Sequence, residues 1–461
     1  MRRAGRVVHL PRGECEERLV RHHGRRAGER RRGPRGDRPR HRQLLGEVLT
    51  GEEGFRMSRQ QSPVSVVILG GGYAGVIAAN RLRGSLTPDE ATRVRVTIVN
   101  PTDRFVHRIR LHEFAAGGED VAFAFPSMVG AGVRLVIGTA RRIDADARRV
   151  VVETAVGPVV VPYDRLVYAV GSSSAVGRVP GAAEHALPIG GLDGAARVRD
   201  VFAAPTPPAR VNVVGGGPTG IEVSSELAEA HPATRIVLLS SGPVGAALRP
   251  AAQRRIVRGL RRLGVEIVDH ARVASVTPDG ASLENGRFVG ADATVWAAEF
   301  DVPTLARDSG LAVDERGRLL VDETLAALDD PAIVGAGDAV RPPDSVAAHL
   351  PMGARVALPM GLAAAERILA ELRGRAPEPL SIGLLGPSIS LGRRDGYIQP
   401  ARPDDSPLPF AFTGRLGAAI KSWVCRMTIN DPRAELSRPG AYRVRRGPAP
   451  RAVAAREDAR V

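Results

Sequence analysis

Two copies of one glycine pattern constrain the fold of this chain more than any other feature. Each copy follows a run of aliphatic residues typical of a buried strand and precedes a helical stretch. The glycines stand at Gly70, Gly72 and Gly75 in the first copy and at Gly215, Gly217 and Gly220 in the second. In such a unit the first glycine permits a tight turn, the second lets a pyrophosphate approach the backbone, and the third lets the helix pack on the strand. The helix N-terminus adds oriented N–H groups for an anion. The pattern therefore predicts an α/β protein with two Rossmann-like dinucleotide-binding domains.

The residue that ends the second strand of each unit bears on the nucleotide. In the dinucleotide pattern an acidic residue there binds a ribose hydroxyl. Here Asn100 takes that position in the first unit and Ser240 in the second. Asparagine can still pair with a ribose. The absence of a carboxylate in the second unit removes a repulsion against a 2′-phosphate, but no arginine follows at once, so NADH and NADPH both stay open as its ligand.

A third glycine-rich segment follows a short apolar strand, where Gly337 and Asp338 end the run from Ala332. An aspartate at the carboxyl end of a strand can accept hydrogen bonds from a polyol such as the ribityl chain of a flavin. The order of the two glycine motifs, then Thr324 and Gly337-Asp338, resembles the FAD-dependent pyridine nucleotide-disulphide oxidoreductase superfamily. The segment from Tyr163 to Gly171 is also similar to the strand that returns to the FAD domain in that superfamily.

The resemblance implies a fold and a set of ligands. It covers about residues 62–430 and places the second domain as an insertion in the first, with a small C-terminal α+β segment. It implies that FAD contacts Gly70, Gly72, Gly75, Asn100, Gly171, Gly337 and Asp338, and that NADH or NADPH contacts Gly215, Gly217, Gly220 and Ser240. It also implies a catalytic glutamate near the nicotinamide and the flavin, a place that Glu222 occupies. The alternative for Glu222 is a carboxylate at the surface or one that serves only the helix dipole.

Cysteine usage narrows the reaction. The chain has two cysteines, Cys15 and Cys425, so it lacks the redox-active pair of the disulfide-reductase branch. Among relatives without that pair, the chain resembles type II NADH dehydrogenases and flavoproteins of the apoptosis-inducing-factor-like group. The implied function is transfer of electrons from NAD(P)H through FAD to a non-thiol acceptor, either a quinone or a small electron carrier. Quinone-reducing members usually carry glutamines in the helix that begins here near Met352, and this chain does not. A redox sensor that binds both cofactors without turnover is the alternative.

No metal site is expected. His107 and His112 are separated by five residues, which does not place both side chains on one helical face. Packing within the flavin domain is the favoured role for both.

The formal net charge of +15 lies mostly at the two ends of the chain. Residues 1–56 contain 16 arginines against 8 acidic residues, and residues 431–461 contain 8 arginines against 4. The body is nearly neutral, so no nucleic-acid partner is expected. Both ends lack the apolar periodicity that would offset their ordering entropy. Disorder is therefore predicted for them, with the native protein starting at Met57.

The expected organisation follows from the motifs and the charge. It is a disordered leader at 1–56, an FAD-binding domain at 57–185 and 301–380, an NAD(P)H-binding domain at 186–300, a C-terminal interface segment at 381–430 and a disordered basic tail at 431–461. Three apolar stretches at 133–137, 149–153 and 157–161 predict one antiparallel meander.

A helix is predicted over residues 415–430, with an apolar stripe on one side and cations elsewhere. The stripe consists of Leu416, Ile420, Trp423, Val424 and Met427. Such a helix can lie in a membrane interface and bring a cytoplasmic flavoprotein to the inner face of the cell membrane. The alternatives are that the same stripe packs on the flavin domain or across a homodimer.

Overall fold

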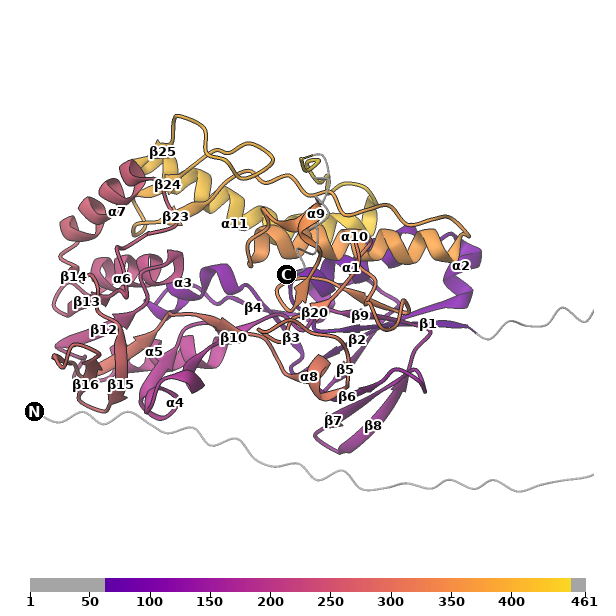
Figure 1. Ribbon diagram of the computed structural model, residues 1–461, viewed down its shortest axis with the longest axis horizontal. Helices are drawn as coiled ribbons and strands as arrows, with labels where there is room; N and C mark the ends of the chain where they lie inside the picture. The colour runs from indigo at the N-terminus through magenta and orange to yellow at the C-terminus, as the bar shows by residue number, and fades with distance from the viewer. Residues whose placement is uncertain (1–62, 449–461) are drawn as a thin grey trace, which may run out of the picture. The chain divides into compact units, whose positions relative to one another are not determined.

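The computed structural model describes residues 63–448 (Figure 1), so the expected disordered leader at 1–56 lies outside the described residues. Two five-stranded parallel sheets with helices packed on them form the framework. This arrangement confirms the predicted α/β class.

Most strands of the first sheet are runs of apolar residues buried on both faces, as parallel strands covered by helices require, whereas its edge strand at 133–137 is only partly buried. Its strand order is β21-β9-β1-β2-β5. The strands are β1 (Val64–Leu69), β2 (Val94–Asn100), β5 (Val133–Ile137), β9 (Arg165–Tyr168) and β21 (Ile333–Gly335). Helices α1 (Tyr73–Ser85) and α10 (Ala354–Leu372) pack closely together. A Cβ added at Gly361 of α10 would lie 2.2 Å from the carbonyl oxygen of Ala74, so only glycine allows this approach.

The second sheet repeats this plan with the order β11-β18-β12-β13-β14. Its strands are β11 (Ala186–Pro188), β12 (Arg210–Val214), β13 (Arg235–Leu239), β14 (Glu266–Val268) and β18 (Ala293–Trp296). Its helices are α5 (Leu192–Ala203), α6 (Pro218–Ala230) and α7 (Pro250–Arg262). All five strands fall between β9 and β21 in the sequence. The second fold is therefore inserted in the first, as predicted.

The predicted meander was wrong in one of its strands. The antiparallel sheet consists of β6 (Thr139–Asp144), β7 (Arg149–Thr154) and β8 (Gly157–Pro162). The stretch at 133–137 is instead β5, which pairs in parallel with β2 at the edge of the first sheet. A short apolar run has the same pattern in either context, so its periodicity does not distinguish them.

Shorter elements complete the two folds and the connections between them. The small sheets are β3 (Arg104–Val106) with β4 (Ala122–Ala124), β10 (Ser173–Ser174) with β19 (Phe300–Asp301), β20 (Leu319–Leu320) with β22 (Val340–Arg341), and β15 (Val273–Thr277) with β16 (Gly280–Leu283) and β17 (Phe288–Gly290). The short helices are α2 (Pro88–Arg93), η1 (Arg108–Arg110), α3 (Leu111–Ala115), η2 (Phe125–Ser127), η3 (Val176–Arg178), α4 (Ala182–His185), α8 (Leu305–Asp308) and α9 (Asp344–Ala347).

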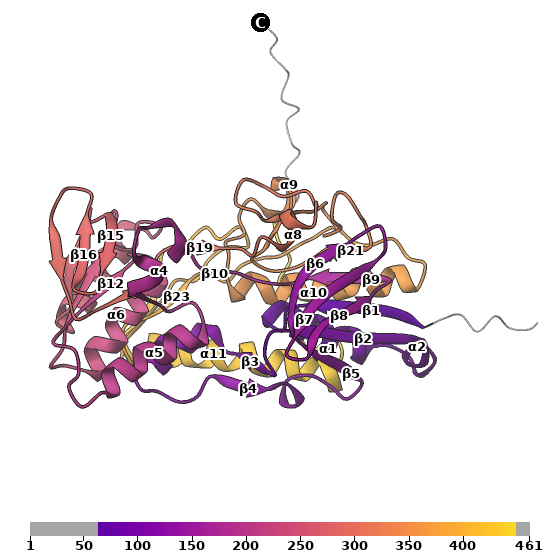
Figure 2. The same cartoon turned by 90° about the horizontal axis from the view of Figure 1, so that it is seen from below.

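The C-terminal segment is α+β, as predicted. It contains an antiparallel sheet of β23 (Ser388–Ser390), β24 (Gly396–Ile398) and β25 (Phe412–Thr413), followed by α11 (Gly414–Ser437). Helix α11, yellow in Figures 1 and 2, runs from this small sheet to α1 and contacts both.

The prediction of disorder from residue 431 was wrong for the part that the structure describes. Helix α11 continues to Ser437, and two contacts with α1 hold its last turns. Asn80 Nδ2 donates to the carbonyl of Pro432 at 2.7 Å, and Arg81 Nε lies 2.5 Å from Oε2 of the fully buried Glu435. Composition did not reveal this order because the partners on α1 lie more than 350 positions earlier in the chain.

The face that α11 buries also differs from the predicted stripe. The buried line is Gly417, Lys421, Cys425 and Ile429. Leu416 and Trp423 of the predicted stripe are 58% and 54% exposed, so packing of these two on the flavin domain is excluded. Within residues 63–448 no helix has the length and apolar character needed to span a membrane.

Candidate active site

The first glycine turn has the geometry that a dinucleotide needs. Gly70 adopts a φ of +99°, a left-handed conformation that favours glycine. A Cβ at Gly75 would lie 1.9 Å from the carbonyl oxygen of Gly70, so the start of α1 can approach β1 only without a side chain. A Cβ at Gly72 would meet nothing within 4 Å. The space in front of this middle glycine is open and fits a pyrophosphate next to the N-terminus of α1.

The second turn repeats this geometry at the start of α6. Gly215 has a φ of +126°, and a Cβ at Gly220 would lie 1.8 Å from the carbonyl oxygen of Gly215. A Cβ at Gly217 again would meet nothing within 4 Å. The residues at both turns therefore fit a dinucleotide.

The residues that end the second strands lie against these turns. Asn100 Oδ1 accepts a hydrogen bond from the backbone N–H of Gly71 at 2.9 Å, and its Nδ2 donates to the carbonyl of Thr102 at 2.9 Å. The buried Ser240 stands in the equivalent place, because its Oγ is 1.9 Å from where a Cβ on Gly216 would be. Both side chains thus brace the turn, and their contact with a ribose stays a prediction.

Asp338 stands just beyond β21, next to the end of β9. Its Oδ1 accepts from the backbone N–H of Gly353, which caps α10, and its Oδ2 accepts from the hydroxyl of Ser172, each at 2.7 Å. Gly171 and Gly337, with φ of +68° and +83°, flank these contacts. All seven residues predicted for FAD therefore lie near the carboxyl ends of β1, β2, β9 and β21, where open α/β sheets bind their ligands.

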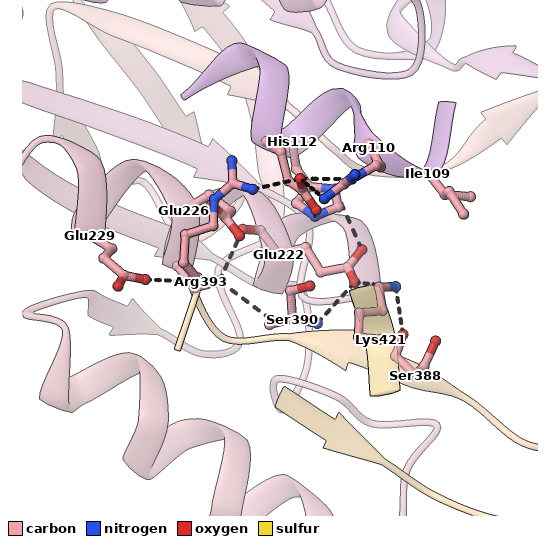
Figure 3. Close-up of polar contacts among 12 residues, drawn as sticks. Ile109, Arg110, His112, Glu222, Glu226, Glu229, Ser388, Ser390, Arg393 and Lys421 are labelled. Atoms are coloured by element: carbon pink, nitrogen blue, oxygen red, sulfur yellow. Dashed lines mark hydrogen bonds and ion pairs between the residues drawn. The ribbon is translucent and has the colours of Figure 1, made fainter. Parts of the chain in front are cut away.

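Glu222 of α6 is buried, with 9% of its surface exposed, so the surface alternative was wrong. Its Oε1 lies 2.8 Å from Lys421 Nζ and accepts from the backbone N–H of Ser390 at 3.0 Å (Figure 3). Lys421 Nζ also donates to the carbonyl of Ser388 at 3.0 Å. The pair therefore joins the second fold to α11 and the small C-terminal sheet.

The charges of this pair stabilise each other. Burial raises the pKa of Glu222, but Lys421, His112 and the hydrogen bond from Ser390 together outweigh burial and lower it. Burial lowers the pKa of Lys421, but Glu222, with smaller contributions from Cys425 and Glu113, outweighs burial and raises it. Both groups are therefore charged at neutral pH. One feature of the sequence singles out a member of this pair. Lys421 is the only lysine among the 65 basic residues of the chain.

A second set of polar side chains surrounds the pair (Figure 3). His112 of α3 faces Glu222, with its Nδ1 3.9 Å from Glu222 Oε2. Arg393 Nη1 lies 2.6 Å from Glu113 Oε2, and Arg393 Nε lies 2.8 Å from Oε2 of Glu226, one turn after Glu222 on α6. Burial raises the pKa of Glu226 to about 7, although Arg393 opposes this. Nothing in the local sequence reveals these contacts.

The two histidines take separate roles. His107 packs against α11, and its Nε2 lies 3.1 Å from the hydroxyl of Thr428 on that helix. His112 is grouped instead with Glu113 and Glu226, whose ligand-type atoms lie within 4.8 Å of one another. The one cysteine among residues 63–448, Cys425, is buried, and burial raises the pKa of its thiol to about 11. It is therefore no thiolate at neutral pH.

Comparison with known proteins gives the family. The family model for pyridine nucleotide-disulphide oxidoreductases matches residues 64–361. An NADH dehydrogenase-like protein of Mycobacterium tuberculosis is 33% identical over 290 residues, which cover 59% of this chain and 72% of the relative. The type II NADH:quinone oxidoreductase Ndh of the same species is 28% identical over 375 residues, covering 70% of this chain and 77% of that protein.

A solved structure shows the same fold. NDH2 from Plasmodium falciparum in complex with NADH superposes with a TM-score of 0.65 at 14% identity, covering 82% of this chain and 99% of that one. The family model and the sequence relatives show that the chain is an oxidoreductase similar to NADH dehydrogenases. The segment that matches the family model runs from β1 into α10 and includes both glycine turns, Glu222 and Asp338. The chain therefore belongs to the pyridine nucleotide-disulphide oxidoreductase family.

Proposed function

We propose that this protein is an FAD-dependent NAD(P)H oxidoreductase, with FAD at the Gly70–Gly75 turn, NADH or NADPH at the Gly215–Gly220 turn, and a non-thiol electron acceptor. The observation that carries the proposal is the pair of glycine turns with matching geometry, each open in front of its middle glycine. When bound, FAD would accept a hydride from the nicotinamide and pass two electrons to the acceptor. The protein would supply binding, orientation and the charges around Glu222.

A quinone is the acceptor that we propose, in preference to a small electron carrier. The support is that the type II relative from Mycobacterium tuberculosis is named for quinone reduction. The buried Cys425 offers no reactive thiol in the described part of the chain, which argues against a dithiol mechanism. The start of α10 lacks the glutamines that are usual in quinone-reducing members, so the proposal of a quinone depends on the named relative.

Peripheral contact with an anionic membrane surface is part of this proposal. Beside the exposed Leu416 and Trp423 lies an open hollow of about 340 Å³. It is lined by Arg393, Arg394, Arg415, Ala418, Ala419 and Ser422. Arginines next to apolar side chains suit an interface of lipid headgroups and acyl chains. A homodimer through the same residues is the competing arrangement.

Steady-state oxidation of NADH and NADPH by the FAD-loaded protein tests the function. The acceptors should be a water-soluble quinone, ferricyanide and a ferredoxin. We expect turnover with the quinone and with ferricyanide. A protein that binds FAD yet oxidises neither nucleotide with any acceptor would contradict the proposal and favour a sensor.

Two matched variants test which turn holds which cofactor. Gly217→Val should abolish reduction by NAD(P)H while FAD stays bound, and Gly72→Val should lose FAD. Both folds should survive, because a Cβ at either position meets nothing within 4 Å and neither backbone has a positive φ. Thermal unfolding of the cofactor-free proteins checks this. Wild-type reduction of Gly217→Val by NADH would show that the two sites are assigned wrongly.

A further inference from the structure

A line of titratable side chains leads from Glu222 toward solvent. The imidazole of His112 lies between two carboxylates, with Nδ1 3.9 Å from Glu222 Oε2 and Nε2 3.8 Å from Glu113 Oε1. An oxygen of Glu226 lies within 4.8 Å of the His112 and Glu113 ligand-type atoms. Arg393, whose side chain is 44% exposed, contacts both Glu113 and Glu226 at the outer end (Figure 3).

His112 is poorly accounted for by packing alone. It is 4% exposed, and its Nε2 is buried without a hydrogen-bond partner among the described residues. An unpartnered buried polar atom costs free energy. A neutral imidazole, however, has one nitrogen that donates and one that accepts, so it can take a proton on one side and release one on the other. Both gaps are slightly beyond hydrogen-bond reach, and a small rotation of the ring closes one of them at a time.

We propose that Glu226, Glu113 and His112 form a proton relay from solvent at Arg393 to Glu222. This rests on the proposed function, in which NAD(P)H + H⁺ + quinone gives NAD(P)⁺ + quinol. The hydride carries two electrons and one of the two protons that the quinol gains. The second proton must come from solvent, and the relay delivers it to Glu222, beside the predicted position of the nicotinamide and flavin. The three residues act on the reaction only through Glu222. They are therefore positioning residues and not catalytic residues.

The charges around the relay suit proton transfer near neutral pH. Burial raises the pKa of Glu226 to about 7, with Arg393 opposing and Glu113, Glu229 and Glu222 assisting. Glu226 therefore changes its protonation state in the working range, next to the half-exposed Arg393. Burial lowers the pKa of His112; Glu222 and Glu113 oppose this, while Lys421 and Arg393 assist it. The imidazole accordingly stays neutral, the form that both accepts and donates.

A metal ion is a poorer occupant of the same cluster. Arg110 Nη2 lies 2.7 Å and Arg393 Nη1 lies 2.6 Å from Glu113 Oε2, and Arg393 Nε holds Glu226 Oε2. Two guanidinium groups already neutralise the carboxylates, so a divalent cation would enter against two positive charges.

The test compares an acceptor that takes up protons with one that does not. In the FAD-loaded protein, Glu226→Gln and His112→Gln should each lower NADH turnover with a water-soluble quinone by about tenfold or more, the lower end of general acid–base effects. Turnover with ferricyanide, which takes one electron and no proton, should stay within about twofold. Glu229→Gln is the matched control, because Glu229 also lies on α6 and its Oε2 also contacts Arg393, through the backbone N–H at 2.5 Å. It should change neither rate below pH 7, where Glu226 keeps its proton, although it can lower the pKa of Glu226.

The pH profile separates a relay from a structural role. Wild-type quinone turnover should fall as pH rises through about 7, where Glu226 loses its proton. This step should vanish in Glu226→Gln. Equal losses with both acceptors, or an unchanged profile in Glu226→Gln, would overturn the relay. Loss of wild-type turnover on adding a chelator would assign the cluster to a metal and overturn it too. A wild-type protein that oxidises NADH with neither acceptor would overturn the proposed function itself, and the relay with it.

Discussion

Asp338 links the end of β21 to the first turn of α10, and FAD binding should depend on it more than on any other single side chain. Asp338→Ala should lose most of the FAD that copurifies with the wild type. Loss of one or two hydrogen bonds to a charged group, at about 1.5–3 kcal/mol each, weakens binding by about tenfold to ten-thousandfold or more. Flavin absorbance of the purified protein and a fluorescence titration of the cofactor-free protein measure this.

Asp338→Asn is the control for the loss of the cap. It keeps a side-chain oxygen that can accept from the backbone N–H of Gly353. Its binding of FAD should lie between those of the wild type and Asp338→Ala. Full retention of FAD by Asp338→Ala would mean that the aspartate only caps α10.

Lys421→Met should leave Glu222 as a buried charge without its partner and destabilise the fold by about 3–5 kcal/mol at neutral pH. The folded pKa of Glu222 lies below its ordinary 4.5, so its contribution is present above 4.5 and is lost as pH falls through the folded value. The folded pKa of Lys421 lies above its ordinary 10.5, so its contribution is present below 10.5 and is lost as pH rises through the folded value. Urea unfolding from pH 4 to 9 measures the difference, which should shrink toward the acid end (~pH 4) because Glu222 can then be protonated.

Lys421→Arg is the matched comparison, because it keeps the positive charge. We expect it to cost less than Lys421→Met at every pH. If both variants were equally destabilised, the stability would depend on the shape of the lysine side chain and not on its ion pair with Glu222.

The single residues that local sequence could predict are those whose role depends on backbone geometry. Gly70 and Gly215 are recognisable because turn, strand and helix lie within about ten positions, a distance over which spacing determines structure. The partners of Glu222 are different. Ser390 is 168 positions away from it, and Arg393 is 280 positions from Glu113. Such contacts depend on how helices and strands that are distant in the sequence pack together, and a local sequence pattern does not predict this packing.

At the scale of elements, α11 shows where hydrophobic periodicity fails. The apolar positions predict a face through Leu416 and Trp423, but the helix buries a line that contains Lys421 and ends near Glu435. Charged residues on that line have partners on α6 and α1, so their burial is compensated. A prediction that places every charged residue toward solvent therefore selects the wrong side of α11 as the buried face. The existence of the helix was predictable, and its orientation was not.

The exposed side of α11 can be tested with vesicles. We expect the protein to cosediment with anionic vesicles, to bind neutral ones weakly, and to dissociate as salt rises, since each arginine near the surface adds about 1 kcal/mol that salt screens. Trp423→Ala should weaken binding. Phe288→Ala, which removes an aromatic that is 51% exposed on β17, should not.

Two outcomes would contradict membrane contact. Equal absence of binding to both vesicle types would leave the exposed side of α11 to another partner. A concentration-dependent dimer that Trp423→Ala dissociates would assign this side to a second copy of the chain.

At the scale of the whole molecule, α11 connects the two dinucleotide folds. Lys421 binds α6 of the second fold, and Glu435 binds Arg81 of α1 in the first. Arg81→Met should leave the fully buried Glu435 without its cation and cost about 3–5 kcal/mol. In a Trp423→Phe background, flavin fluorescence reports on the first fold during urea unfolding, and the buried Trp296 of β18 reports on the second.

Arg83→Met is the control on the same helix, because Arg83 makes one long hydrogen bond of 3.4 Å, to the carbonyl of Ala131. It should cost less than about 1 kcal/mol. In Arg81→Met the flavin signal should be lost at a lower urea concentration than the Trp296 signal. Equal effects of the two substitutions would show that Glu435 needs only its backbone donors at Gly440 and Tyr442.

The position of α11 in the chain has a consequence for how the protein is made. Both glycine turns and Glu222 leave the ribosome before the segment that begins at Gly414. Until that segment emerges, the carboxyl of Glu222 lacks the ammonium that keeps it ionised inside the protein, and α1 lacks the carboxylate that pairs with Arg81. A nascent chain can thus form both glycine turns before α11 supplies the cation of Glu222 and the carboxylate of Arg81.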